Sequence, residues 1–222
     1  GISDPKHARA AAAFGADFVG MVFAPSRRQV TLGQAKSIAK ALGKDPGDHL
    51  ISDADIEEAL RVRKPLLVGV FADQDADTIN SIAKEVGLDV VQLSGSEPWE
   101  VNASLERPVI KCMKMRTGET ASELLFHYHG GALLLLDPFV EGVYGGTGQT
   151  LDWRIAAEIA SNTPTVLAGG LTPENVSEAV RSVQPWAVDV SSGVETDGTK
   201  DPEKIRAFIA AAKAVGDASE PN

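Results

Sequence analysis

The sequence has a single cysteine, no cluster of basic side chains and no long apolar run. The one cysteine, Cys112, excludes an internal disulfide and a cysteine-rich metal site, and it is typical of a reducing compartment such as the cytoplasm, where we expect this protein to act. No apolar run approaches the roughly 20 residues that a membrane-spanning helix needs. The net charge of −10, without a run of Lys and Arg, argues against nucleic acid and anionic membranes as partners.

The composition and the hydrophobic pattern are those of an α/β protein. Of the 222 residues, 43% are hydrophobic and 23% charged, which permits a substantial core and argues against disorder. Short apolar runs alternate with amphipathic segments, and such near-continuous runs are typical of strands buried on both faces. The runs lie at residues 16–23, 66–71, 89–93, 109–113, 132–136, 165–168 and 186–191.

Helix start signals stand between these runs, and the repeated order of strand and helix predicts a parallel sheet with right-handed crossovers. A capping residue followed by proline occurs at Ser3-Asp4-Pro5, at Thr172-Pro173 and at Asp201-Pro202. Seven strands are one fewer than a closed (β/α)8 TIM barrel has, so we expect the first strand to lie largely upstream of Gly1. We expect one domain over residues 1–222, with a surface insertion at about 42–64 and a frayed tail at about 215–222.

Three glycine-rich turns follow consecutive strands in the last third of the chain, within residues 137–148, 167–171 and 189–195. Such turns place backbone N–H groups at helix starts, where they bind phosphate, although glycine also occurs in ordinary sharp turns. Three sets on neighbouring strands favour a phosphate site, and we expect the last set to open a short extra helix. The candidate phosphate-binding residues are Gly146, Thr147, Gly148, Gly169, Gly170, Ser191, Ser192 and Gly193.

Asp137 follows four leucines, at the carboxyl end of a strand, where the catalytic groups of barrels lie and where burial raises the pKa of a carboxyl group. Asp137 also belongs to one of several segments that together resemble a known enzyme family. The chain resembles phosphoribosylanthranilate isomerase, a (β/α)8-barrel enzyme of tryptophan biosynthesis. The segments that carry the resemblance are residues 15–20, 23–30, 68–71, 91–95, 136–137, 145–153, 167–176 and 188–195.

The resemblance implies an Amadori rearrangement of N-(5-phosphoribosyl)anthranilate by general acid–base catalysis, with a small phosphorylated substrate and no metal or organic cofactor. It implies that Asp137 is the general acid and that Arg28, rather than Arg27, binds the anthranilate carboxylate through paired donors. The family's general base is a cysteine in a Lys-x-Cys-Gly-Ile segment, of which Gly1 and Ile2 are present here. The chain as given therefore lacks the base, since Cys112 lies in a different strand and is expected to be a buried core thiol.

Several alternatives remain open at this point. Lys111 is the one candidate for the strand-end lysine of an indole-glycerol-phosphate synthase, whereas a pentose-phosphate epimerase needs metal-binding histidines that are missing. A barrel that binds the phosphosugar without converting it is a third alternative, because the base is absent. The long insertion resembles fungal members, which are often fused to other tryptophan-pathway domains. Ser94 stands where most relatives have histidine, which puts the rate or affinity in question rather than the reaction type.

Overall fold

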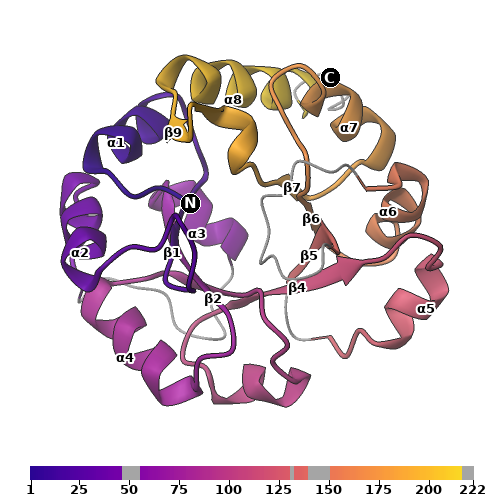
Figure 1. The fold of residues 1–222 in the computed structure, drawn as a ribbon, viewed down its shortest axis with the longest axis horizontal. Helices are drawn as coiled ribbons and strands as arrows, with labels where there is room; N and C mark the ends of the chain where they lie inside the picture. Colours follow the sequence, from indigo (N-terminus) through magenta and orange to yellow (C-terminus); the bar gives the residue numbers. More distant parts are fainter. Residues whose placement is uncertain (47–55, 131–132, 140–150, 217–222) are drawn as a thin grey trace. The chain divides into compact units, whose positions relative to one another are not determined.

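The computed structural model describes residues 1–46, 56–130, 133–139 and 151–216, which belong to two compact units, residues 1–111 and 112–222 (Figure 1). In the first unit, strands β1, β2 and β3 and the start of β4 are neighbours in chain order, and all pairs are parallel. The elements are α1 (Pro5–Ala13), β1 (Phe18–Val22), α2 (Leu32–Ala41), α3 (Ile56–Val62), β2 (Leu66–Phe71), α4 (Ala76–Val86), β3 (Val90–Leu93), the 3-10 helix η1 (Trp99–Ser104) and β4 (Val109–Met115).

The second unit contains the end of β4 and continues the same alternation. Strands β5, β6 and β7 are parallel neighbours in chain order, and β8 and β9 form a short antiparallel hairpin. The elements are α5 (Ala121–Phe126), β5 (Leu133–Pro138), α6 (Trp153–Ala160), β6 (Thr165–Leu167), α7 (Val176–Val183), β7 (Ala187–Val188), the 3-10 helix η2 (Ser192–Val194), β8 (Glu195–Thr196), β9 (Thr199–Lys200) and α8 (Pro202–Gly216).

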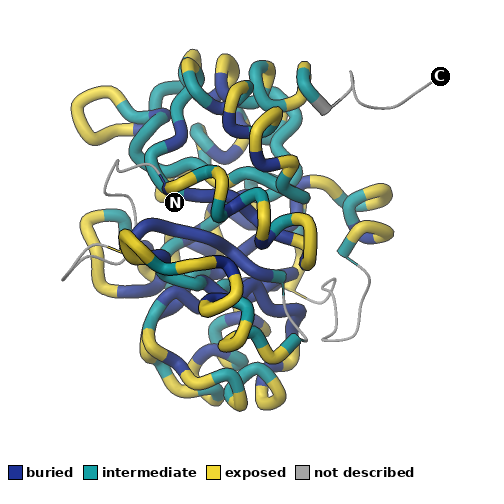
Figure 2. Tube along the Cα trace, turned by 90° about the vertical axis from the view of Figure 1, so that its right-hand side faces the viewer, coloured by how far each residue is buried: buried dark blue, intermediate teal, exposed yellow. Residues whose placement is uncertain are grey.

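All seven predicted strands are present, and helices pack side by side within each unit. In the first unit α1 lies against α2 and α2 against α4; in the second, α5 to α8 are neighbours in chain order (Figure 1). Strands β2, β3, β5 and β6 consist mainly of buried residues, and Figure 2 shows buried segments inside the tube with exposed ones around them. The side chains of Leu66, Phe71, Leu134 and Leu136 are fully buried, as strands covered on both faces require.

The amino end of the first unit lies beside β1. The N–H of Ile2 donates to the carbonyl of Gly20 at 2.7 Å, while Phe23 donates to Val70 of β2 at 2.8 Å. Successive residues of a strand direct their backbone groups to opposite sides, so Ile2 lies along the side of β1 that faces away from β2.

Two of the three predicted helix starts are confirmed. Asp4 accepts a hydrogen bond from the N–H of Lys6 at 2.6 Å, and Asp201 accepts one from Glu203 at 2.9 Å, each with a proline in the first turn. The start predicted at Thr172-Pro173 was placed too early, because α7 begins at Val176.

The reason for the later start of α7 is the side chain of Asn175. It accepts from the N–H of Thr172 at 2.8 Å and donates to the carbonyl of Gly170 at 3.0 Å. These bonds fold residues 173–175 into a turn that is tied back to the glycine pair.

The predicted surface insertion contains one described helix, α3, and residues 47–55 lie outside the described residues. Arg63 follows α3 and forms a buried ion pair with Asp89 at 2.9 Å, and Asp89 also accepts the N–H of Leu67 at 2.8 Å. These contacts attach the end of the insertion to the start of β2. The predicted tail lies mostly outside the described residues, and the single domain stays a prediction.

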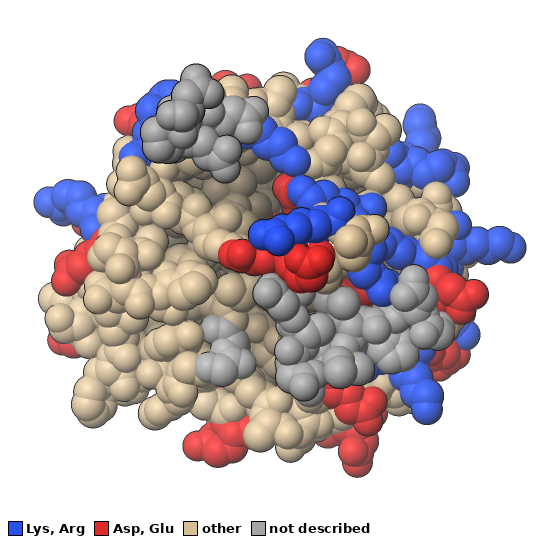
Figure 3. Space-filling view, turned by 180° about the vertical axis from the view of Figure 1, so that it is seen from behind, with Lys and Arg blue, Asp and Glu red and all other residues tan. Residues whose placement is uncertain are grey.

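The exposed surface carries both signs of charge. Figure 3 shows acidic and basic side chains next to one another on the face that it draws. Exposed ion pairs such as Lys36 with Glu85 and Arg206 with Glu203 belong to this surface. Within the described part of the chain, no helix is both long and apolar enough to cross a membrane.

Candidate active site

Asp137 lies in β5, directly after four leucines, as the sequence predicts. Its side chain is 9% exposed, and Leu134 and Leu136 on the same strand are fully buried. A carboxyl group in such surroundings is largely removed from water. The strand therefore presents a buried acid near its carboxyl end, where the catalytic groups of barrels lie.

Lys114 is the ion-pair partner of this acid, and the sequence analysis did not identify it. Its ammonium nitrogen Nζ lies 2.6 Å from Oδ2 of Asp137, with 19% of the lysine side chain exposed. The predicted strand ended at Met113, whereas β4 continues to Met115 and so includes Lys114. β4 contains a second buried lysine, Lys111, and each of the two has an acidic partner; for Lys114 the ionised carboxyl group of Asp137 compensates the burial of its charge.

The environment shifts the pKa of both groups. Burial raises the pKa of Asp137 above its usual range, Asp189 adds to this rise, and Lys114 opposes it only in part. Burial opposes the charge of Lys114, but the Cys112 thiol and the Asp137 carboxyl together hold its pKa above the usual value. The raised pKa means that the Asp137 carboxyl group holds a proton to a higher pH than an exposed aspartate does, which a proton donor requires.

The glycine pair after β6 lies against Asp137. Gly169 and Gly170 both have left-handed backbone conformations, with φ of +81° and +62°. A β-carbon on Gly169 would lie 2.1 Å from Cδ of Pro138 and 3.4 Å from Oδ1 of Asp137, so a side chain does not fit there. The structure thus brings together two predicted site residues, Asp137 and Gly169.

The predicted short helix after β7 is present as η2, and it packs closely against the turn that follows the glycine pair. A β-carbon on Gly193 would lie 1.9 Å from the carbonyl oxygen of Leu171. The carbonyl of Ser191 accepts a hydrogen bond from Lys200 at 2.7 Å, and Lys200 is paired with Glu195 at 3.1 Å. The hairpin of β8 and β9 therefore fixes the turn that contains Ser191, Ser192 and Gly193.

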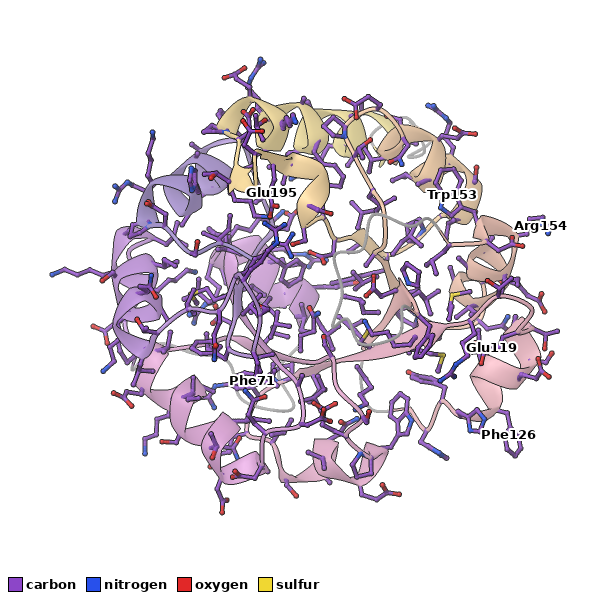
Figure 4. The ribbon with its side chains drawn as sticks, viewed as in Figure 1. Phe71, Glu119, Phe126, Trp153, Arg154 and Glu195 are labelled. Carbon is purple, nitrogen blue, oxygen red and sulfur yellow. The ribbon has the colours of Figure 1, made fainter. Side chains whose placement is uncertain are left out.

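The first predicted glycine set lies outside the described residues. Gly146, Thr147 and Gly148 belong to residues 140–150, and α6 follows them. Trp153 and Arg154 lie at the start of that helix (Figure 4). Asp152 caps this helix by accepting a hydrogen bond from the N–H of Arg154 at 3.0 Å, and it pairs with the Arg154 guanidinium at 2.9 Å. These contacts give the Asp152 carboxylate a structural role at the start of α6.

Arg28 belongs to the first unit, in the loop between β1 and α2. Its side chain is half-buried, whereas Arg27 is exposed, in keeping with the preference for Arg28. The hydroxyl of Ser26 accepts the N–H of Arg28 at 3.2 Å. A β-carbon on Gly1 would lie 3.6 Å from Cδ of Arg28, so the arginine stem lies beside the first residue.

Three further residues of the sequence analysis have defined surroundings. Ser94 is buried, and its hydroxyl accepts from the side-chain amide of Gln92 at 3.1 Å. Cys112 is buried, as predicted, and it favours the charged form of Lys114, two residues along the same strand. Lys111, the candidate catalytic lysine of the synthase alternative, is bound to Glu97.

Comparison with known proteins identifies the family. Residues 44–211 match the family model described as N-(5'phosphoribosyl)anthranilate (PRA) isomerase. An N-(5'-phosphoribosyl)anthranilate isomerase of Roseiflexus castenholzii is 46% identical over 216 residues, which cover 96% of each chain. The chain belongs to the PRA isomerase family.

The solved structure of the Thermotoga maritima PRA isomerase gives the fold. It superposes with a TM-score of 0.76 at 31% identity, covering 96% of each chain, and confirms the predicted (β/α)8 barrel class. A multifunctional tryptophan biosynthesis protein of Phycomyces blakesleeanus is 42% identical over 246 residues, covering 97% of this chain and 32% of that protein. PRA isomerase domains thus also occur as parts of longer tryptophan-pathway proteins.

Proposed function

We propose that this PRA isomerase converts N-(5'-phosphoribosyl)anthranilate by an Amadori rearrangement in tryptophan biosynthesis, with Asp137 as the general acid. The observation that carries the assignment is the buried carboxyl group of Asp137, with its raised pKa, against the Gly169 turn. A proton donor is needed at the ribose ring oxygen, and a carboxyl group with a raised pKa holds its proton to a higher pH than an exposed aspartate does.

The reaction proceeds by proton transfers that balance within the substrate and two protein groups. Asp137 gives its proton to the ring oxygen as the bond from that oxygen to C1′ breaks, and the anthranilate nitrogen forms a double bond to C1′. A general base then removes the proton from C2′, which gives an enolamine that tautomerises to the ketose. We assign the base to the cysteine of the family's Lys-x-Cys segment, which precedes the Gly-Ile dipeptide matched by Gly1 and Ile2.

The phosphate group of the substrate is assigned to backbone N–H groups of the three glycine-rich turns. Two of these, at Gly169-Gly170 and at Ser191–Gly193, belong to the second unit with Asp137, and their glycines are sterically required where they pack against Pro138 and Leu171. Anchoring the phosphate there fixes the ribose for proton transfer, so that binding energy is used for positioning. Gly146, Thr147 and Gly148 complete the assignment.

The test is conversion of the substrate by this chain and by a version in which a Lys-x-Cys segment precedes Gly1. The 13C NMR signal of C2′ changes from an alcohol to a ketone carbon when isomerisation occurs. We expect conversion by the extended version, and none when its cysteine is replaced with serine. Calorimetric binding without conversion by the extended version would instead support a non-catalytic phosphosugar-binding module.

Replacing Arg28 with methionine is expected to raise KM about ten- to a hundredfold while kcat changes less. The reason is that a bidentate, charge-assisted pair with the anthranilate carboxylate is lost, although the proton donor is untouched. Steady-state kinetics of the extended version measures both constants. Arg27→Met, which removes the same charge from the exposed neighbouring position, is the matched control, and an equal rise of KM in both variants would contradict the assignment to Arg28.

A further inference from the structure

Lys114 and Asp137, the candidate acid, form an ion pair that is largely buried. Lys114 comes from β4 and Asp137 from β5, and their charged atoms lie 2.6 Å apart with 19% and 9% of the side chains exposed. A lysine so little exposed costs free energy unless a partner neutralises it. Lys114 therefore has a local electrostatic partner in the group to which the proton donor is assigned.

We propose that Lys114 is a positioning residue for the proton donor: it holds one carboxyl oxygen of Asp137 and stabilises the carboxylate that remains after Asp137 has given its proton to the substrate. The inference rests on the proposed function of Asp137. It adds a residue that does not touch the substrate and that acts through the acid.

The geometry separates the two oxygens of the carboxyl group. Oδ2 accepts the hydrogen bond from Lys114, while Oδ1 lies on the side of Gly169, where a β-carbon would come within 3.4 Å of it. In the part of the chain that the structure describes, Lys114 is the only hydrogen-bond donor to this carboxyl. Oδ1 is thus the oxygen that carries the transferable proton, toward the turn assigned to phosphate binding.

The charged groups around Asp137 determine whether the loss of Lys114 raises or lowers the pKa of Asp137. Lys114 favours the carboxylate, Asp189 after β7 opposes it, and burial opposes it as well. The Cys112 thiol faces Lys114 from the same strand and favours its ammonium form. Without Lys114, burial and Asp189 would act unopposed, so the pKa of Asp137 would rise further and the acid would release its proton less readily.

This predicts two linked changes in Lys114→Met. The acid works only while it is protonated, so activity falls as pH rises through its pKa, and a higher pKa moves this fall to higher pH. At the plateau, kcat should drop about ten- to a hundredfold, the effect of losing one charge-assisted hydrogen bond that the transition state strengthens. Lys114→Arg retains the charge and should recover most of both properties.

The experiment combines a pH–rate profile with a direct titration of the Asp137 carboxyl by 13C NMR, in the protein that turns over substrate and in the Lys114→Met, Lys114→Arg and Lys36→Met variants. Lys36 is a half-exposed lysine paired with Glu85, so its variant removes one positive charge that the proposed reaction does not use. We expect the NMR titration and the high-pH limb of the rate profile to move upward together in Lys114→Met alone.

The outcomes distinguish the two proposals. An unchanged Asp137 titration in Lys114→Met, in a protein that Asp137→Asn inactivates, overturns the role of Lys114 and leaves the acid assignment intact. A shifted titration with an unchanged rate profile overturns the assignment of Asp137 as the acid. Equal loss of kcat in Lys114→Met and Lys114→Arg without any shift of the profile would indicate a packing role, which contradicts the proposal.

Discussion

Asp137→Asn is expected to lower kcat by about 10²- to 10⁴-fold, the usual contribution of a general acid. Asparagine has nearly the same shape, and its amide oxygen can still accept the hydrogen bond that Lys114 donates to Oδ2 at 2.6 Å. It has no carboxyl proton to give to the ring oxygen. Substrate binding should persist, since the glycine turns that are assigned to phosphate remain.

The measurement is kcat together with a calorimetric dissociation constant for the ketose product. Asp152→Asn is the matched control, because Asp152 is an exposed cap of α6 and asparagine caps helices about as well. We expect that control to stay within a factor of about two of the parent kcat. An Asp137→Asn variant that keeps more than a tenth of the activity would show that another group protonates the ring oxygen.

The strands and the position of the acid could be predicted because they depend on local pattern. Unbroken apolar runs such as 66–71 mark strands buried on both faces, and Asp137 is conspicuous directly after four leucines. The resemblance to PRA isomerases then gave the reaction, which the family comparison confirms. The roles of the single site residues stay predictions, which the kinetic variants above test.

Lys114 could not be predicted because its burial depends on a residue 23 positions away. A lysine directly after the run 109–113 is typical of the solvent-exposed end of a strand, and pairing with Asp137 lets this one lie largely buried. The late start of α7 has a similar cause, since Asn175 bonds to Thr172 and Gly170 and so delays the helix that Pro173 would otherwise open. Side-chain hydrogen bonds determine both the burial of Lys114 and the start of α7, and such bonds produce no periodic pattern in the sequence.

Lys111→Met is expected to lower the free energy of unfolding by about 3–5 kcal/mol, because it leaves a buried carboxylate without its partner. The ammonium of Lys111 lies 3.1 Å from Oε2 of Glu97 and 2.6 Å from its carbonyl oxygen, and the two side chains are 6% and 3% exposed. Glu97 also accepts the N–H of Asp73 at 2.8 Å, and Asp73 accepts that of Ser96 at 2.7 Å. The pair therefore connects the loops that follow β2 and β3.

Urea unfolding measures the loss of unfolding free energy in Lys111→Met, and two further variants test whether the stranded carboxylate causes it. Lys36→Met breaks a half-exposed pair with Glu85 and should cost no more than about 1 kcal/mol. The double variant Lys111→Met, Glu97→Gln removes the stranded charge and should recover part of the loss, while the amide can still accept from Asp73. If the single variant loses less than about 1 kcal/mol, water reaches Glu97, and Lys111 is not needed for stability. A chemical role for Lys111, such as the catalytic lysine of the synthase alternative, would then again have to be considered.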